Sequence, residues 1–467
     1  MSLLADLVDL GIAGFGFLPL RIFHDTIDEL VDYPFIDEIF HVQQAQAYCD
    51  GDWQYWNSKI TTPPGLYWLG ALYDNLVDST CSLDELRSLN LLGGVVLAAL
   101  AYYLRRRVHN AGFSTFSILM NPLLSIYYSL FYTDVWSAVL TIGGYCIATV
   151  RPFKKDIMNA ALSAMLGFVS ITFRQTNIVW TAFSMVALLD SIAKDQNLYT
   201  GDFNQDMKAL AHLAVSRIGL LVPYMLVAAA FGFFVYSNGG ITLGDKTNHM
   251  ITFHAMQLFY CATFITGFTL PLWFSFKIIE DYIKDNLLSK KGLFWNAIWI
   301  PLIGLTIKNF TVIHPFLLAD NRHYVFYLVR RFIMRTENAR YELIPIYHFS
   351  CYVVWKFIKQ SFSEYSSSNS SLAMFFALIC STALTLVPSP LLEPRYFIIP
   401  FLFFRMMINP SFDPIINVEW LRKHNTAIRL VLEGIWIWMW TQAVYVIFIR
   451  YTFPWDSEIH PQSHLVI

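Results

Sequence analysis

The chain has 467 residues, of which 56% are apolar, 17% aromatic and only 14% charged. Soluble proteins carry roughly 25% charged residues, so this composition excludes a set of soluble domains and indicates a polytopic membrane protein. The formal net charge of −2 also excludes a nucleic-acid-binding protein that depends on overall basicity.

The apolar stretches, taken in chain order, predict many membrane spans. A bilayer core of about 30 Å requires roughly 20 apolar helical residues. Residues 108–150 are long enough for two spans that turn around Tyr132–Asp134. Further spans are expected near residues 3–23, 88–104, 157–173, 177–193, 213–236, 251–275, 293–313, 341–358, 372–388, 395–409 and 427–450. We therefore predict one all-α integral membrane domain over residues 1–467, with about thirteen transmembrane helices.

Basic residues predict the orientation, because short cytoplasmic loops are enriched in Lys and Arg. Residues 105–107, 151–155 and 277–291 hold such groups and fall on one side of the membrane. The opposite side then holds a first large loop (24–87) and residues 314–340. The latter include Arg330, Arg331, Arg335 and Arg340, whose position contradicts the charge rule. We interpret this segment as interfacial or re-entrant, since a true span there would reverse the orientation of everything after it.

The first large loop contains the most informative segment, residues 33–67 (YPFIDEIFHVQQAQAYCDGDWQYWNSKITTPPGLY). Pro34 suits the first turn of a helix that should run to about Tyr48 and end before Gly51. Helical spacing then places four side chains on one polar face: Asp37, His41, Gln44 and Tyr48. We interpret the segment as an amphipathic helix on a membrane surface that presents a carboxylate, an imidazole and an amide together. A merely solvated face is the alternative.

Two cysteines, Cys49 and Cys81, fall in this first loop. They could form a disulfide if that side of the membrane is oxidising, and two unpaired residues are the alternative. No Cys or His spacing in the chain suggests a zinc site.

Other polar groups occur at the ends of spans on the same side. They are Asp134 and the segments 174–177, 245–249, 314–323 and 393–396. Ionisable groups at membrane depth are costly and usually line a cavity or pathway, although each could be an ordinary interfacial anchor. Transfer of a sugar from a lipid phosphate would need such groups: a base for the acceptor hydroxyl and cations for the departing phosphate.

Four segments resemble motifs of the eukaryotic dolichyl-phosphate-glucose α-1,2-glucosyltransferases: PFIDEIFHVQQAQAYCDGDW, KITTPPGLY, HPFLLADNRHYVFY and EPRYFIIP. The resemblance implies a C-type glycosyltransferase fold in the endoplasmic reticulum membrane, with a lumen-facing active site. It implies inverting transfer of glucose from dolichyl-phosphate-glucose to the diglucosylated dolichyl-diphosphate-linked oligosaccharide. The expected partners are these two lipids and the bilayer, and no cofactor, metal or nucleic acid is expected.

The resemblance also assigns roles to residues. The acidic pair that opens the first loop holds the base, which we assign to Asp37, with Glu38 as the competing choice. Adjacent helix positions diverge by about 100°, and Asp37 shares a face with His41. Four residues are candidates for the donor phosphate, Arg322 and His323 first, then Arg395 and Lys59. The predicted substrate-binding residues are His41, Gln44, Trp53, Trp56, Asp320 and Tyr396.

Several alternatives remain at this stage. Arg395 could be an anchor that is salt-bridged to Glu393, and Trp53 and Trp56 could be interface aromatics. A related mannosyltransferase that uses dolichyl-phosphate-mannose would share the fold, because sequence reasoning does not separate epimeric sugars. A transporter or channel-associated protein would instead favour charged groups near the bilayer midplane.

Overall fold

We analysed a computed structural model of the chain, which describes residues 3–78, 80–106, 111–246, 250–319, 321–363, 371–408, 412–415, 418–453 and 463–464. The chain folds into two compact units, and we describe each by itself. The first comprises Met1–Met120, Leu124–Met250 and Ser371–Ser381, and the second comprises Asn121–Leu123, Ile251–Ser370 and Thr382–Ile467. Helices dominate both units, and the described strands are one antiparallel pair of two residues each, β1 (Thr452–Phe453) and β2 (Ser463–His464).

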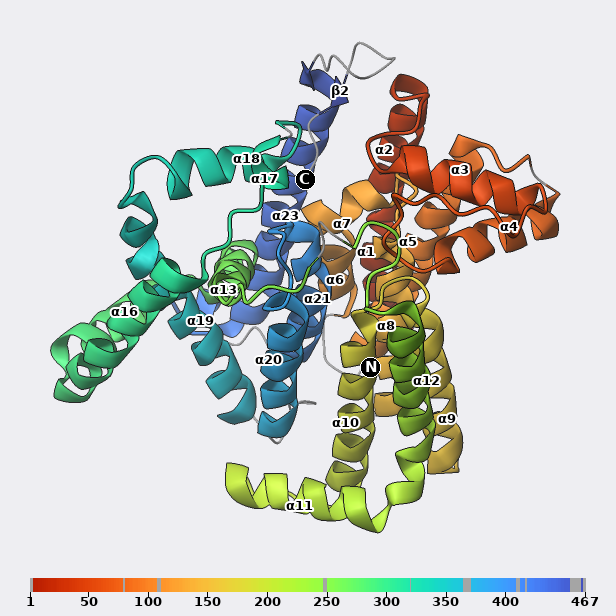
Figure 1. The fold of residues 1–467 in the computed structure, drawn as a ribbon. Coiled ribbons are helices and arrows are strands. Elements are labelled where there is room, and N and C mark those ends of the chain that lie inside the picture. The colour runs from red at the N-terminus through yellow and green to blue at the C-terminus, as the bar shows by residue number, and fades with distance from the viewer. Residues whose placement is uncertain are drawn as a thin grey trace. The chain divides into compact units, whose positions relative to one another are not determined.

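The first unit contains the helices of the N-terminal half (Figure 1). They are α1 (Leu3–Phe15), α2 (Phe17–Leu30), α3 (Glu38–Cys49), α4 (Gly65–Val77), α5 (Leu83–Arg105), α6 (Ala111–Leu119), α7 (Pro122–Tyr127), α8 (Asp134–Val150), α9 (Asp156–Ile171), α10 (Asn177–Asp195), α11 (Phe203–Ser216), a 3-10 turn (Ile218–Leu220) and α12 (Val222–Asn238). The first two residues of α7 are assigned to the second unit, and helix α20 (Leu372–Leu386) begins in the first.

Small residues allow α8, α9 and α10 to pack closely, and α12 lies alongside α9 and α10 (Figure 1). The Ser163 hydroxyl on α9 donates to the Gly144 carbonyl on α8 at 2.8 Å. A Cβ at Gly167 would lie 2.4 Å from the side chain of Thr181 on α10, so that crossing requires glycine. Without water to drive association, close van der Waals packing of this kind holds membrane helices together.

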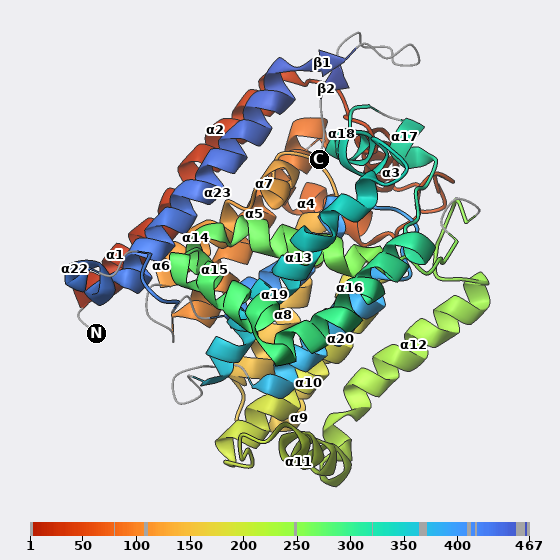
Figure 2. The same cartoon turned by 90° about the vertical axis from the view of Figure 1, so that its left-hand side faces the viewer.

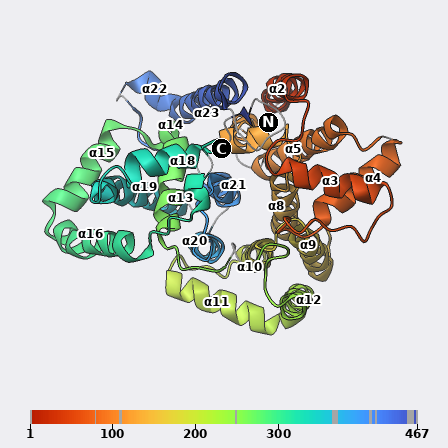
Figure 3. The same cartoon turned by 45° about the horizontal axis from the view of Figure 1, so that its top comes forward.

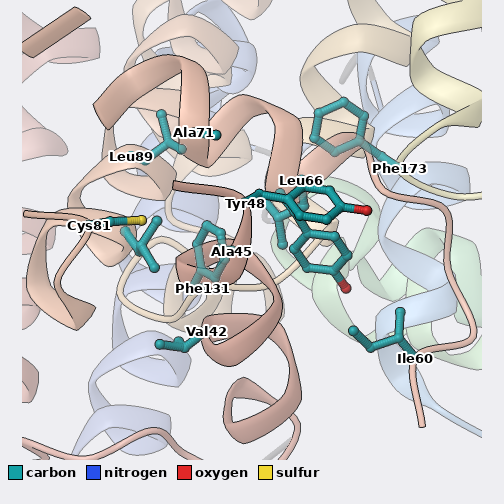
Figure 4. Packing of buried hydrophobic residues seen from close by; sticks show 12 residues of the cluster. Val42, Ala45, Tyr48, Ile60, Leu66, Ala71, Cys81, Leu89, Phe131 and Phe173 are labelled. Carbon is teal, nitrogen blue, oxygen red and sulfur yellow. The ribbon is translucent and has the colours of Figure 1, made fainter. Parts of the chain in front are cut away.

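Helices α3 and α4 lie side by side (Figure 3) and carry their own apolar core. The core includes Val42 and Tyr48 from α3 and Leu66 and Ala71 from α4 (Figure 4). It also includes Phe173, from the segment between α9 and α10. A disulfide between Cys49 and Cys81 ties the end of α3 to the start of α5. Of the two alternatives for these cysteines, the structure has the bonded pair.

The second unit contains the remaining helices (Figure 2). They are α13 (Met256–Phe268), α14 (Leu270–Trp273), α15 (Phe276–Tyr282), a π-helical segment (Ile283–Leu288), α16 (Lys290–Phe310), α17 (Phe316–Ala319), α18 (Tyr324–Leu328), a second π-helical segment (Val329–Ile333), a 3-10 turn (Ala339–Leu343), α19 (Ile344–Ser363), a 3-10 turn (Pro394–Phe397), α21 (Ile398–Met407), α22 (Glu419–Lys423) and α23 (Asn425–Arg450).

Two buried arginines stabilise the second unit. Arg405 on α21 pairs with Glu433 on α23 through two hydrogen bonds of 2.6 Å. Arg429 donates to the carbonyls of Pro271 and Leu272, at 2.9 and 2.8 Å, where α14 ends. These donors satisfy carbonyls that a helix terminus would otherwise leave unpaired in an apolar environment.

Three described helices are long and apolar enough to cross a membrane, Leu7–Leu30, Leu83–Arg105 and Asn425–Arg450, and five shorter apolar helices accompany them. The first of the two spans predicted within residues 108–150 does not form one continuous helix in the described part of the chain. That stretch contains the short helices α6 and α7, because Pro122 follows Asn121 and cannot continue the preceding helix. Residues 315–340 form only short helical pieces, and their placement at the interface stays a prediction.

Candidate active site

The helix that follows the predicted base begins later in the chain than expected. Helix α3 starts at Glu38 with Asp37 as its N-cap residue, so the prediction that Pro34 opens the helix is wrong. Ile36 has a φ of 49°, a left-handed conformation that is unfavourable for a β-branched residue. Strain of this kind persists only where the surroundings fix the backbone strongly, and it concentrates at functional sites.

The Tyr132 hydroxyl is one of the groups that fix this turn. It donates to the Phe35 carbonyl at 3.1 Å and accepts the Asp37 N–H at 3.2 Å. The two bonds lie on either side of Ile36. They hold the backbone of the base-bearing turn in one conformation.

Glu38 is fully buried and is committed to structural contacts. Its carboxylate accepts the backbone N–H groups of Phe35 at 2.9 Å and Phe131 at 2.6 Å. It also accepts Nε of Arg87 at 3.1 Å and a terminal nitrogen of that guanidinium at 2.7 Å. With an exposed fraction of 0%, Glu38 has no surface to offer an acceptor hydroxyl. The geometry therefore favours Asp37 over Glu38 as the base.

Arg87, which sequence reasoning missed, also holds the residues that precede this turn. Its guanidinium donates to the carbonyls of Val31 at 2.7 Å and Tyr33 at 3.1 Å, and to Asp28 at 3.2 Å. The one signal in the sequence is a cation near the start of an otherwise apolar span. Buried charges of this kind are tolerated only when paired and hydrogen-bonded.

His41 lies one helical turn after Asp37, between two tyrosine rings. Its Nδ1 is 2.7 Å from the Tyr67 hydroxyl, and its ring centroid is 5.6 Å from that of Tyr132. Burial raises the pKa of Tyr67, so its phenol stays neutral at physiological pH. A neutral phenol can donate to Nδ1 and so leave the imidazole proton on Nε2.

A partly buried ion pair joins Asp134, which is buried, to Arg174, which is half-buried. Arg174 contacts Asp134 at 2.9 Å and donates to the Thr133 hydroxyl at 3.2 Å. Both partners belong to the polar groups expected at span ends. The pair links the start of α8 to the chain that follows α9.

Gln44, a predicted substrate-binding residue, holds the loop that follows α3, and its substrate role stays a prediction. It is fully buried, its amide nitrogen donates to the Tyr55 carbonyl at 2.7 Å, and its amide oxygen accepts the Asn57 N–H at 2.8 Å. Tyr48 on the same face is also buried. The second half of the expected polar face, Gln44 and Tyr48, therefore packs inward and Gln44 holds the following loop, whereas Asp37 and His41 are half-buried. The placement of α3 at a membrane surface stays a prediction.

The loop after α3 holds the other residues of the first unit that were predicted to contact the substrates. Trp53 is 58% exposed, and its ring lies 5.1 Å from Tyr48. Trp56 is half-buried against Tyr67, with ring centroids 6.3 Å apart, and Lys59 is exposed. An exposed indole beside the carboxylate-bearing helix suits contact with a sugar ring, and this role stays a prediction for both tryptophans.

The turn at residues 61–65 docks on the end of α9. The Gly65 N–H donates to the Thr172 carbonyl at 2.8 Å, and the Gln175 amide donates to the Thr61 carbonyl at 2.7 Å. A Cβ at Gly65 would lie 2.3 Å from the Thr172 hydroxyl, so glycine is required for this approach. The turn is thus fixed by tertiary contacts in addition to its two prolines.

The leading phosphate candidates belong to the second unit. Arg322 is buried, and His323 is half-buried at the start of α18. Arg395 forms an ion pair with Glu393, as the anchor alternative expected, and its guanidinium lies 6.0 Å from the ring centroid of the half-buried Tyr396. Asp320 lies outside the described residues. The phosphate and substrate roles of this group stay predictions.

Within the described part of the chain, one group of three potential metal ligands lies close together, Cys49, Asp74 and Cys81. Its two sulfur atoms are joined in the disulfide, so they do not offer thiolates to a metal.

Comparison with known proteins places these motifs in a family. A model described as the DIE2/ALG10 family matches residues 31–406. A protein of Debaryomyces hansenii named Dol-P-Glc:Glc(2)Man(9)GlcNAc(2)-PP-Dol alpha-1,2-glucosyltransferase is 38% identical, over 91% of this chain and 92% of its own length. A Mus musculus protein of the same name is 32% identical, over 91% of each chain.

Among solved structures, the archaeal oligosaccharyltransferase AglB from Archaeoglobus fulgidus, in complex with an inhibitory peptide and a dolichol-phosphate, is similar with a TM-score of 0.47. The likeness covers 95% of this chain and 56% of that protein at 11% identity. It is too weak to support an inference about function. The family model and the two relatives each match most of the chain, and the chain therefore belongs to the DIE2/ALG10 family.

Proposed function

We propose that this protein transfers glucose from dolichyl-phosphate-glucose to the diglucosylated dolichyl-diphosphate-linked oligosaccharide and forms an α-1,2 linkage. The observation that carries the proposal is the near full-length match to relatives named for this reaction. The turn at residues 35–38, in which Glu38 is fully buried and Asp37 is half-buried, supports the proposal by offering one carboxylate as a candidate base.

In the proposed reaction, Asp37 accepts the proton of the acceptor hydroxyl as that oxygen attacks the anomeric carbon of glucose. The bond between the anomeric carbon and the phosphate oxygen breaks, and dolichyl phosphate leaves with the electron pair. A single displacement inverts the anomeric centre and forms no covalent glycosyl-enzyme. The cations that stabilise the departing phosphate are Arg322 and His323, with Arg395 and Lys59 as further candidates.

The proposed setting is the endoplasmic reticulum membrane, with a C-type glycosyltransferase fold, about thirteen spans and the active site in the lumen. The Cys49–Cys81 disulfide supports a luminal position for the first loop, since disulfides persist in oxidising compartments. Residues 24–87 then form the luminal loop that bears the catalytic motif, and residues 314–340 form a luminal interfacial segment.

The test compares the wild-type protein with Asp37→Asn, using purified full-length protein, labelled donor and diglucosylated acceptor. Loss of a general base is expected to lower kcat by about 10²- to 10⁴-fold. Asp50→Asn is the matched control, because it makes the same change at an exposed residue at the other end of α3.

Two outcomes would contradict the proposal. Normal transfer by Asp37→Asn would remove this residue from the base role. Faster transfer from dolichyl-phosphate-mannose than from dolichyl-phosphate-glucose by the wild-type protein would support the mannosyltransferase alternative.

A further inference from the structure

An arginine-lined cavity in the second unit has no role in the reaction described above. Its volume is about 920 Å³, and its lining consists of Leu318, Phe326, Arg330, Arg331, Met334 and Arg335. We call this cavity the arginine groove. All of its residues belong to one unit, so its geometry does not depend on how the two units are placed.

The local fold directs the arginines into the groove. Val325 and Val329 are buried with Leu317 in a small core, which fixes one face of the helical segment from α18 to Ile333. The segment continues as a π-helix from Val329, a form that is frequent at functional sites. The guanidinium of Arg330 lies 5.1 Å from the Phe326 ring centroid, which orients it by a cation–π contact.

The charge of the groove is only partly compensated. Arg335 forms an ion pair of 2.7 Å with Glu342. Arg330 and Arg331 are exposed, and among the described residues neither has a carboxylate at ion-pair distance. The three arginines and this one carboxylate leave a net charge of about +2, the complement of a doubly charged anion.

The two lipids of the proposed reaction differ in the charge of their phosphate groups. The phosphodiester of the donor carries one negative charge, whereas the diphosphate diester of the acceptor carries two. Guanidinium groups bind phosphate oxygens through paired N–H donors, and neighbouring arginines suit two linked phosphates. Leu318, Phe326 and Met334 offer apolar surface in the same groove, which suits the first isoprene units of a lipid chain.

We propose that the arginine groove binds the diphosphate of the lipid-linked acceptor. The inference rests on the proposed function, because it takes its ligand from that reaction. The glycan lies between the acceptor diphosphate and the sugar that receives glucose, so this site need not adjoin Asp37. A luminal anion site would also account for arginines on the side of the membrane where the charge rule disfavours them.

The test uses the full-length double variant Arg330→Gln/Arg331→Gln, reconstituted with both lipids. The Michaelis constant for the acceptor should rise by about 10-fold or more, because two charge-assisted hydrogen-bond donors are lost. The Michaelis constant for the donor and kcat should stay within about twofold. Arg330→Lys/Arg331→Lys keeps the charge and should recover part of the acceptor affinity.

The matched control is Lys290→Gln/Lys291→Gln, an exposed pair in the same unit that makes the same change in net charge. Equal effects of the two double variants, or a rise confined to the Michaelis constant for the donor, would overturn the inference. Direct retention of labelled acceptor on immobilised protein separates this inference from the proposed function. A wild-type protein that retains the acceptor through these arginines but transfers no glucose would refute the function and support the site.

Discussion

The conversion of Glu38 to glutamine tests whether the two adjacent carboxylates have separate tasks. Glutamine keeps the size of the side chain but replaces one acceptor oxygen by a donor nitrogen. Each carboxylate oxygen of Glu38 accepts one backbone N–H and one nitrogen of Arg87. In either orientation, the new amide nitrogen would therefore face two donors and could accept neither.

The expected cost follows from these contacts. Removal of one partner from a buried ion pair costs about 3–5 kcal/mol, because the other charge stays buried without full compensation. Arg87 would retain Asp28 and two carbonyls, which limits the loss to the lower part of this range. Asp37 is half-buried whereas Glu38 is fully buried, so Asp37→Asn should change the free energy of unfolding far less.

The assay is thermal unfolding of the purified full-length variants in detergent, read by intrinsic fluorescence, with transfer activity measured below the transition. Glu38→Gln should unfold several degrees below the wild-type protein, and Asp37→Asn should unfold near the wild-type temperature with its activity lost. A Glu38→Gln protein that unfolds like the wild type yet transfers no glucose would refute this reasoning.

Three further substitutions test the rest of the first unit. Gly65→Ala should lower the free energy of unfolding by about 1–3 kcal/mol and should also lower activity, because its Cβ would lie 2.3 Å from a threonine hydroxyl. Gly232→Ala is the control in the same unfolding assay, since a Cβ at Gly232 would have open space. Cys49→Ser should lower stability by about 3–4 kcal/mol, since the bond to Cys81 closes a loop of 32 residues, and peptide mapping without reductant should detect the pair in the wild type only. Tyr132→Phe removes two hydrogen bonds from the turn at residues 35–37. It should lower kcat by about 10-fold with little change in KM. An unchanged kcat would show that the turn holds its shape without this hydroxyl.

Hydropathy predicted the helical architecture well, because an apolar run of sufficient length has few other ways to satisfy its backbone in a membrane. Helices occur at most of the expected spans, including α5, α8 and α23. The clearest difference lies before residue 134, where hydropathy is continuous but Asn121 and Pro122 interrupt the helix. Window-averaged composition does not register such a break, whereas the chemistry of proline does.

The site was predictable in its residue types but not in its contacts. The angle between adjacent helix positions predicted different surroundings for Asp37 and Glu38, and the structure has Asp37 half-buried and Glu38 fully buried. The sequence did not show which surroundings each would meet, because Arg87 reaches Glu38 from 49 positions further along the chain. Gln44 illustrates the same limit, since its spacing identified a shared face but not that the face packs against a loop.

The separation of tasks between the two carboxylates explains why a costly buried charge pair lies beside a candidate base. A general base must be held within a fraction of an ångström of its substrate, and a strained residue at Ile36 would relax if the turn were free. Glu38 fixes the N–H of Phe35, Tyr132 fixes the carbonyl of Phe35 and the N–H of Asp37, and Arg87 holds the carboxylate of Glu38. These contacts act on the backbone, so they can position the half-buried Asp37 for the proposed proton transfer.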